Sequence, residues 1–113
     1  MLYLVIHGLE AVIGALTHYE PDTLHQLPPF VYKDAILLAK AILGRVEFRE
    51  AVKEVSKQHP IAGSKDSIGS YVDNIIAELD EGIDSDEVED KHGAIQAALQ
   101  SSHDLISHVE KLL

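Results

Sequence analysis

The feature that most constrains the fold is a regular spacing of mostly apolar residues in the last quarter of the chain. These residues recur at alternating steps of four and three: Val88, His92, Ile95, Leu99, Ser102, Ile106, Val109 and Leu113. Such steps return a side chain to the same face of an α-helix. Because Asp84 and Glu87 form a capping-box pattern, we place the start of this helix near Asp84. The predicted C-terminal helix has about 28 residues and a length of roughly 40 Å.

Earlier parts of the chain carry helical patterns of their own. They predict helices over residues 2–18, 29–43, 46–58 and 65–81. Residues 2–6 could instead begin as a short strand, and residues 23–27 could add one further helical turn. Because segment 29–43 is apolar on almost every side, we expect it to be the central helix.

Glycine, proline and serine mark the expected ends of these helices. Pro29 suits a first helical position, and Ser64 is a natural cap for the helix that follows it. Gly44 and Gly82 are expected to end the helices that precede them.

These elements predict an all-α fold, a compact bundle of about five helices with a long C-terminal helix, in which residues 1–113 form a single helical domain. Hydrophobic residues make up 46 % of the chain, enough for one core, while aromatic residues make up only 5 %. Aliphatic side chains must therefore fill the core, which favours packing between helices. The last helix is longer than so small a domain needs, so its apolar seam could also form a homodimer.

The cysteine count and the apolar runs indicate where the protein works. The chain has no cysteine, which excludes disulfides and thiolate metal sites and fits a reducing compartment. The first basic side chain is Lys33, so we expect no secretory signal peptide. The longest apolar runs, residues 2–6 and 35–39, are too short to span a bilayer. We therefore expect a cytoplasmic protein that does not enter the membrane.

The net charge of −10 is confined to the C-terminal part of the chain. Residues 1–65 contain seven acids and seven bases, whereas residues 66–113 contain twelve acids and two bases. Eight of the thirteen residues in 78–90 are acidic and none is basic. These eight are the candidate partner-binding residues: Glu78, Asp80, Glu81, Asp84, Asp86, Glu87, Glu89 and Asp90.

Two interpretations of this acidic segment stay open. Acids near a helix start favour the positive end of its dipole and keep a protein in solution. Alternatively, the segment docks a protein partner with a basic surface, because long-range attraction accelerates such encounters. The charge argues against direct binding of nucleic acid, whose phosphates it would repel. The segment also lacks the spacing of a calcium loop, since Ala77 and Leu79 would occupy ligand positions.

Elsewhere the charged side chains are interpreted as a solvated surface. Between residues 46 and 58, one row of glutamates lies beside a row formed by Arg49, Lys53 and Lys57.

Histidine and glutamate pairs give a second, weaker set of candidates. Glu89 and His92 have the spacing of half a dinuclear metal site in a helical bundle, and His7 with Glu10 is the comparable pair in reversed order. These four residues are the weak metal candidates. The alternative for His92 is a histidine in or near the core, hydrogen-bonded to a neighbour.

A histidine phosphotransfer domain would match the size, helical class and acidity of the chain. Such domains usually carry the sequence His-x-x-Lys-Gly on an exposed helix. The most similar string here is His7-Gly8-Leu9-Glu10, in which glutamate replaces lysine and would repel the incoming phosphoryl group.

The sequence therefore predicts a non-enzymatic, acidic protein-interaction module without a cofactor. Inhibitors and proteins of the immunity or antitoxin type use such charge to bind a basic partner. A metal-binding or phosphotransfer protein, and a homodimeric structural or adaptor domain, are the alternatives. No catalytic residue is predicted, because no nucleophile is placed beside a histidine by the sequence alone.

Overall fold

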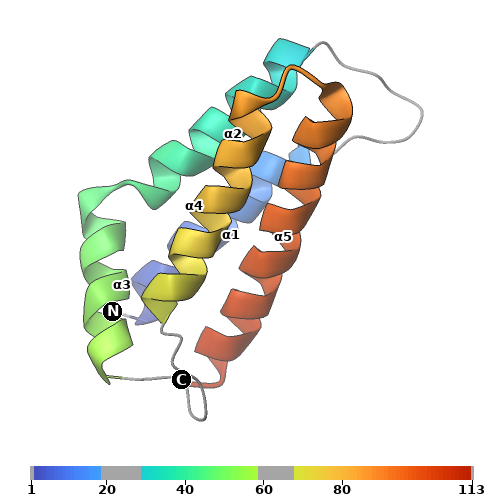
Figure 1. Ribbon diagram of the computed structural model, residues 1–113. Helices are drawn as coiled ribbons and strands as arrows, with labels where there is room; N and C mark the ends of the chain where they lie inside the picture. Colours follow the sequence, from blue (N-terminus) through green and yellow to red (C-terminus); the bar gives the residue numbers. More distant parts are fainter. Residues whose placement is uncertain (1, 19–28, 59–67, 113) are drawn as a thin grey trace.

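The computed structural model describes residues 2–18, 29–58 and 68–112. Five helices lie in these ranges: α1 Leu2–His18, α2 Pro29–Leu43, α3 Val46–Gln58, α4 Ile68–Asp84 and α5 Val88–Glu110 (Figure 1). The predicted all-α bundle is confirmed, and α5 is the longest of these helices. The chain is helical from Leu2, so the strand alternative for residues 2–6 is wrong.

The helices lie along one long axis in a bundle of 42 × 26 × 22 Å. Helices α4 and α5 form an antiparallel hairpin, and α1 packs against α2, α3 and α5 (Figure 1). Helices α2 and α3 follow one another along one side of the bundle, separated by a bend at residues 44–45. Helix α3 contacts α4 near the start of α4, at the opposite end of the bundle from the α4–α5 turn. Among the described residues, no helix combines the length and apolar character that crossing a bilayer requires.

The seam of α5 is used inside the bundle. Ile95, Leu99, Ser102 and Val109 are buried, while Val88, His92 and Ile106 are only partly covered. The buried stripe is rotated slightly from the predicted one, because it also contains Lys91 and Leu105. A homodimer stays a prediction, but this seam is already covered by the chain's own helices.

Helix α2 is not the central helix that its composition predicts. Tyr32 and Ile36 are fully buried, but Leu37 and Leu38 are 44 % and 49 % exposed. Leucine on an outer face costs little, since much of any protein surface is apolar. Helix α2 therefore packs with one face only, like its neighbours.

The α4–α5 boundary differs from the prediction. Gly82 does not end α4, which continues to Asp84, and α5 begins at Val88 and has 23 residues. A Cβ on Gly82 would lie 2.6 Å from Cβ of Ala94, so glycine allows α4 and α5 to approach closely here.

The predicted capping box at the start of α5 is wrong. The N-cap is Glu87, whose side chain makes no capping hydrogen bond. Instead, Ser85 Oγ accepts a hydrogen bond from the Glu87 N–H at 3.1 Å and donates to Asp90 Oδ2 at 2.6 Å. Gly44 does follow the end of α2 as predicted. Ser64, residues 65–67, residues 23–27 and Leu113 lie outside the described residues.

Two glycines of α1 give a matched test of this packing. A Cβ on Gly8 would lie 2.2 Å from Cδ2 of the buried Phe48 ring, whereas a Cβ on Gly14 would meet no atom within 4 Å. We expect Gly14→Ala to stabilise the protein by about 0.5–1 kcal/mol, because alanine is the better helix former. Gly8→Ala should destabilise it, since overpacking costs about 1–3 kcal/mol and exceeds that gain. Urea denaturation measures both; equal stabilities would contradict the close packing of α1 on α3.

Candidate functional site

The eight acidic candidates gather at one end of the bundle. They lie on the last turns of α4, in the turn of residues 85–87 and on the first turn of α5. Because α4 and α5 are antiparallel, Glu78 and Glu81 lie across a groove from Glu89 and Asp90. The groove encloses about 410 Å³ over a floor of small residues: Gly93, Ala94 and Ala97. The fold thus places acids that are contiguous in the sequence at the tip of the α4–α5 hairpin and along the groove beside it. We call residues 78–90 the acidic hairpin.

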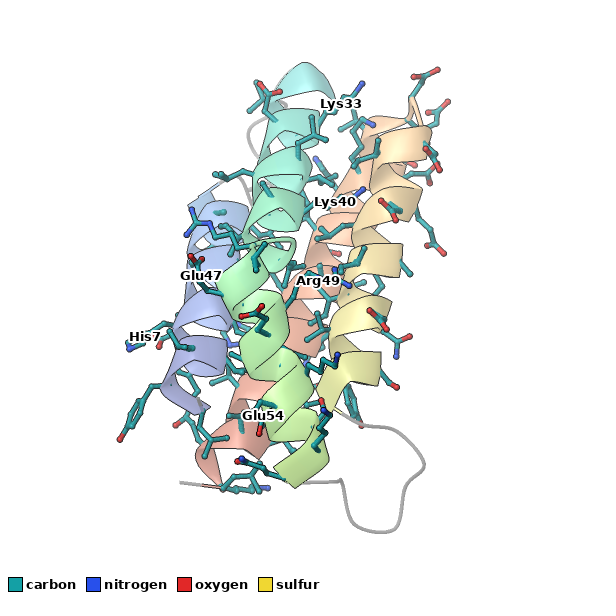
Figure 2. All side chains as sticks on the ribbon, turned by 90° about the vertical axis from the view of Figure 1, so that its left-hand side faces the viewer. His7, Lys33, Lys40, Glu47, Arg49 and Glu54 are labelled. Atoms are coloured by element: carbon teal, nitrogen blue, oxygen red, sulfur yellow. The ribbon has the colours of Figure 1, made fainter. Side chains whose placement is uncertain are left out.

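Three of the eight acids are engaged inside the hairpin or with neighbouring helices. Ser101 Oγ donates a hydrogen bond to Glu78 Oε1 at 2.8 Å, which ties α5 to α4. Asp80 forms an ion pair with Lys40, whose side chain extends from α2 toward α4 (Figure 2). Asp90 accepts the hydrogen bond from Ser85 described above. These carboxylates have a structural use, which lowers their value as contacts for a partner.

The other five acids have no such use. Among the described residues, none of their side chains makes an ion pair or hydrogen bond, and all five are exposed: Glu81, Asp84, Asp86, Glu87 and Glu89. Exposed and unpaired carboxylates repel one another, which favours any arrangement that brings cations to them. These five are the best candidates for contact with a basic partner.

One residue with a structural role at this site, Lys91, is not among the candidates predicted from the sequence. It is 3 % exposed, and its Nζ donates to the Gly82 carbonyl oxygen at 2.7 Å and also to that of Ser85. The last carbonyls of a helix lack partners within it, and they carry the negative end of its dipole. Lys91 therefore caps α4 from inside the hairpin. Its position three residues after Val88 and four before Ile95 is the signal that places it on the inner face of α5.

His92 lies against the ring of Tyr32. The ring centroids are 4.5 Å apart with an interplanar angle of 73°, an edge-to-face contact. Its Nε2 is buried and has no hydrogen-bond partner among the described residues, so the predicted hydrogen bond is not found at this atom.

The four metal candidates are not brought together. His7 Nδ1 lies 3.7 Å from Glu10 Oε1, and both side chains line a groove of about 710 Å³ between α1 and α5 with Tyr3 and His103. His7 points outward from α1 (Figure 2) and His92 packs inward on Tyr32. In the described parts of the chain, no three His, Asp or Glu side chains form a group that could hold a metal ion. His7 is exposed, as a phosphate-accepting histidine would have to be, and phosphotransfer stays a prediction.

Comparison of the chain with protein-family models, curated proteins and solved structures gives no match.

Proposed function

We propose that this protein is a non-enzymatic interaction module whose acidic hairpin binds a protein partner with a basic surface. The observation that carries the proposal is a set of five exposed carboxylates at one end of the bundle that have no partner among the described residues. The adjoining groove between α4 and α5 adds a recess bordered by four carboxylates, with small residues at its floor. A lysine or arginine side chain suits such a recess, because its apolar stem can lie on alanine while its charge meets the carboxylates.

The proposal extends to an inhibitor of the immunity or antitoxin type. A nucleic-acid enzyme needs a basic surface to hold phosphates. An acidic hairpin bound to that surface would compete with the substrate. The proposed partner is therefore a protein that binds nucleic acid.

A pull-down from lysate of the source cell, with washes of rising salt, tests the proposal. We expect a partner with a basic surface that is retained at low salt and released as salt screens the charges. The partner's identity then permits measurement of the affinity at several salt concentrations with purified proteins. A partner whose affinity does not change with salt would overturn the proposal.

A further inference from the structure

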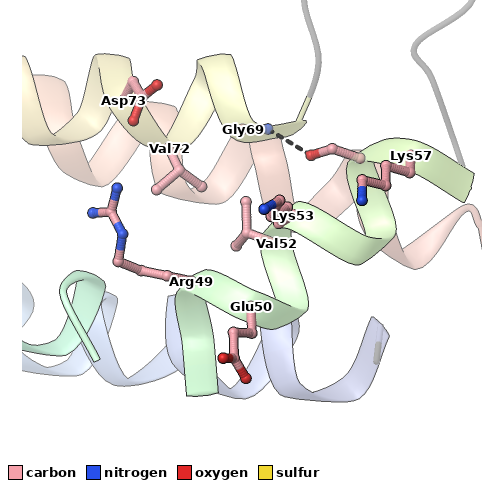
Figure 3. Close-up of a pocket in the computed structure, with 9 residues that line it drawn as sticks. Arg49, Glu50, Val52, Lys53, Lys57, Gly69, Val72 and Asp73 are labelled. Carbon is pink, nitrogen blue, oxygen red and sulfur yellow. Dashed lines mark hydrogen bonds between the residues drawn. The ribbon is translucent and has the colours of Figure 1, made fainter. Parts of the chain in front are cut away.

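A second groove, of opposite character, lies between α3 and α4. It encloses about 510 Å³ and is bordered by six of the α3 residues between Arg49 and Lys57 and by Gly69, Val72 and Asp73 of α4 (Figure 3). Its volume falls within the range of about 300–1,000 Å³ that is usual for small-molecule sites. We call it the α3–α4 groove.

Three cations border this groove on an otherwise acidic protein. Arg49, Lys53 and Lys57 are spaced by four residues on α3, so they share one face and span about 12 Å at 1.5 Å per residue. None of them makes an ion pair or side-chain hydrogen bond within the described parts of the chain. Two carboxylates also line the groove: Asp73 from α4, and Glu50 of α3, which projects away from α4 (Figure 3). The cations thus outnumber the carboxylates that face them.

The groove is apolar below this charged edge. Val52 and Val72, on opposite helices, are 6 % and 4 % exposed and form its floor. Gly69 adds no side chain, and its N–H donates to Ser56 Oγ at 2.9 Å, which fixes the distance between α3 and the start of α4. The positive end of the α4 dipole therefore lies at the Ser56 end of this row of cations, away from Arg49 (Figure 3).

We propose that the α3–α4 groove binds a small amphipathic anion, a carboxylate attached to an apolar chain. The chain would cover Val52 and Val72, and the carboxylate would meet Arg49 and Lys53. Charge complementarity selects an anion, and the short length of the cation row favours a small molecule. This site is independent of the proposed function, because it uses different residues at the other end of α4.

An NMR titration with decanoate below its micelle concentration tests the proposal, with decanol as the uncharged control. We expect saturable shifts in the amide signals of Val52, Gly69 and Val72 with decanoate, and at least tenfold weaker binding of decanol. The variant Arg49→Gln/Lys53→Gln should lose at least tenfold in decanoate affinity.

The control variant is Lys33→Gln/Arg45→Gln, which removes the same charge from exposed cations outside the groove. It should bind decanoate like the unaltered protein, and circular dichroism should show both variants folded. Equal binding of decanol, equal loss in the two variants, or shifts confined to the groove between α1 and α5 would overturn the proposal. A variant with a charge-reversed acidic hairpin should keep its decanoate affinity, so the two proposals fail separately.

Discussion

Reversing four exposed acids of the acidic hairpin should reduce partner binding by about 100-fold or more. The substitutions are Glu81→Lys, Asp84→Lys, Asp86→Lys and Glu87→Lys, and none of these side chains has a partner among the described residues. The loss should be large because like charges facing one another across an interface cost several kcal/mol. Isothermal titration calorimetry with the partner from the pull-down measures the effect.

A second charge-reversed variant separates a local effect from a global one. It reverses four exposed acids outside the acidic hairpin: Asp34→Lys, Glu47→Lys, Asp73→Lys and Glu110→Lys. Each variant changes the net charge by +8, from −10 to −2, because each of four substitutions adds two charges. We expect the control to retain most of its affinity and both variants to unfold cooperatively in urea. Equal losses of affinity would show that net charge, and not the acidic hairpin, drives the association.

The sequence was sufficient to predict the five helices because each carries its own apolar stripe. The ends of α1, α2 and α3 match the predicted ranges, and Gly44 follows α2 as expected. The errors arise where tertiary packing overrides a local signal. Glycine is typical of a helix end, but Gly82 lies within α4. Its missing side chain leaves room for Ala94 and Ile36 to pack against the helix. No local pattern can distinguish these two uses of glycine.

The acidic hairpin could be predicted in part because its residues are contiguous in the sequence. Their individual roles could not, since the partners of Glu78 and Asp80 come from distant segments: Ser101 on α5 and Lys40 on α2. The α3–α4 groove could not be predicted from the sequence for the same reason. In the sequence its three cations look like an ordinary solvent-exposed row on one helix. Only the folded structure brings Val72 and the start of α4 beside them.

Lys91 links the stability of the acidic hairpin to its charge. The two carbonyl oxygens that it caps belong to Gly82 and Ser85, at the end of α4. A methionine at this position would fill similar space but donate no hydrogen bond. It would leave these acceptors without the ammonium and remove the positive charge that directly follows the acidic residues 78–90 in the sequence. Buried acceptors that lose a charged donor typically cost about 1–3 kcal/mol each.

We therefore expect Lys91→Met to destabilise the protein by about 2–4 kcal/mol, which lowers Tm by roughly 10–20 °C in a domain of this size. Lys111→Met is the matched control, because Lys111 is exposed, and it should change stability by less than about 0.5 kcal/mol. Thermal and urea denaturation of both variants measure the difference. Added salt should restore only the part of the loss that comes from carboxylate repulsion, since screening does not replace hydrogen bonds. Equal stability of the two variants would contradict the capping role, whereas a selective loss would show that the buried Lys91 ammonium stabilises the end of α4.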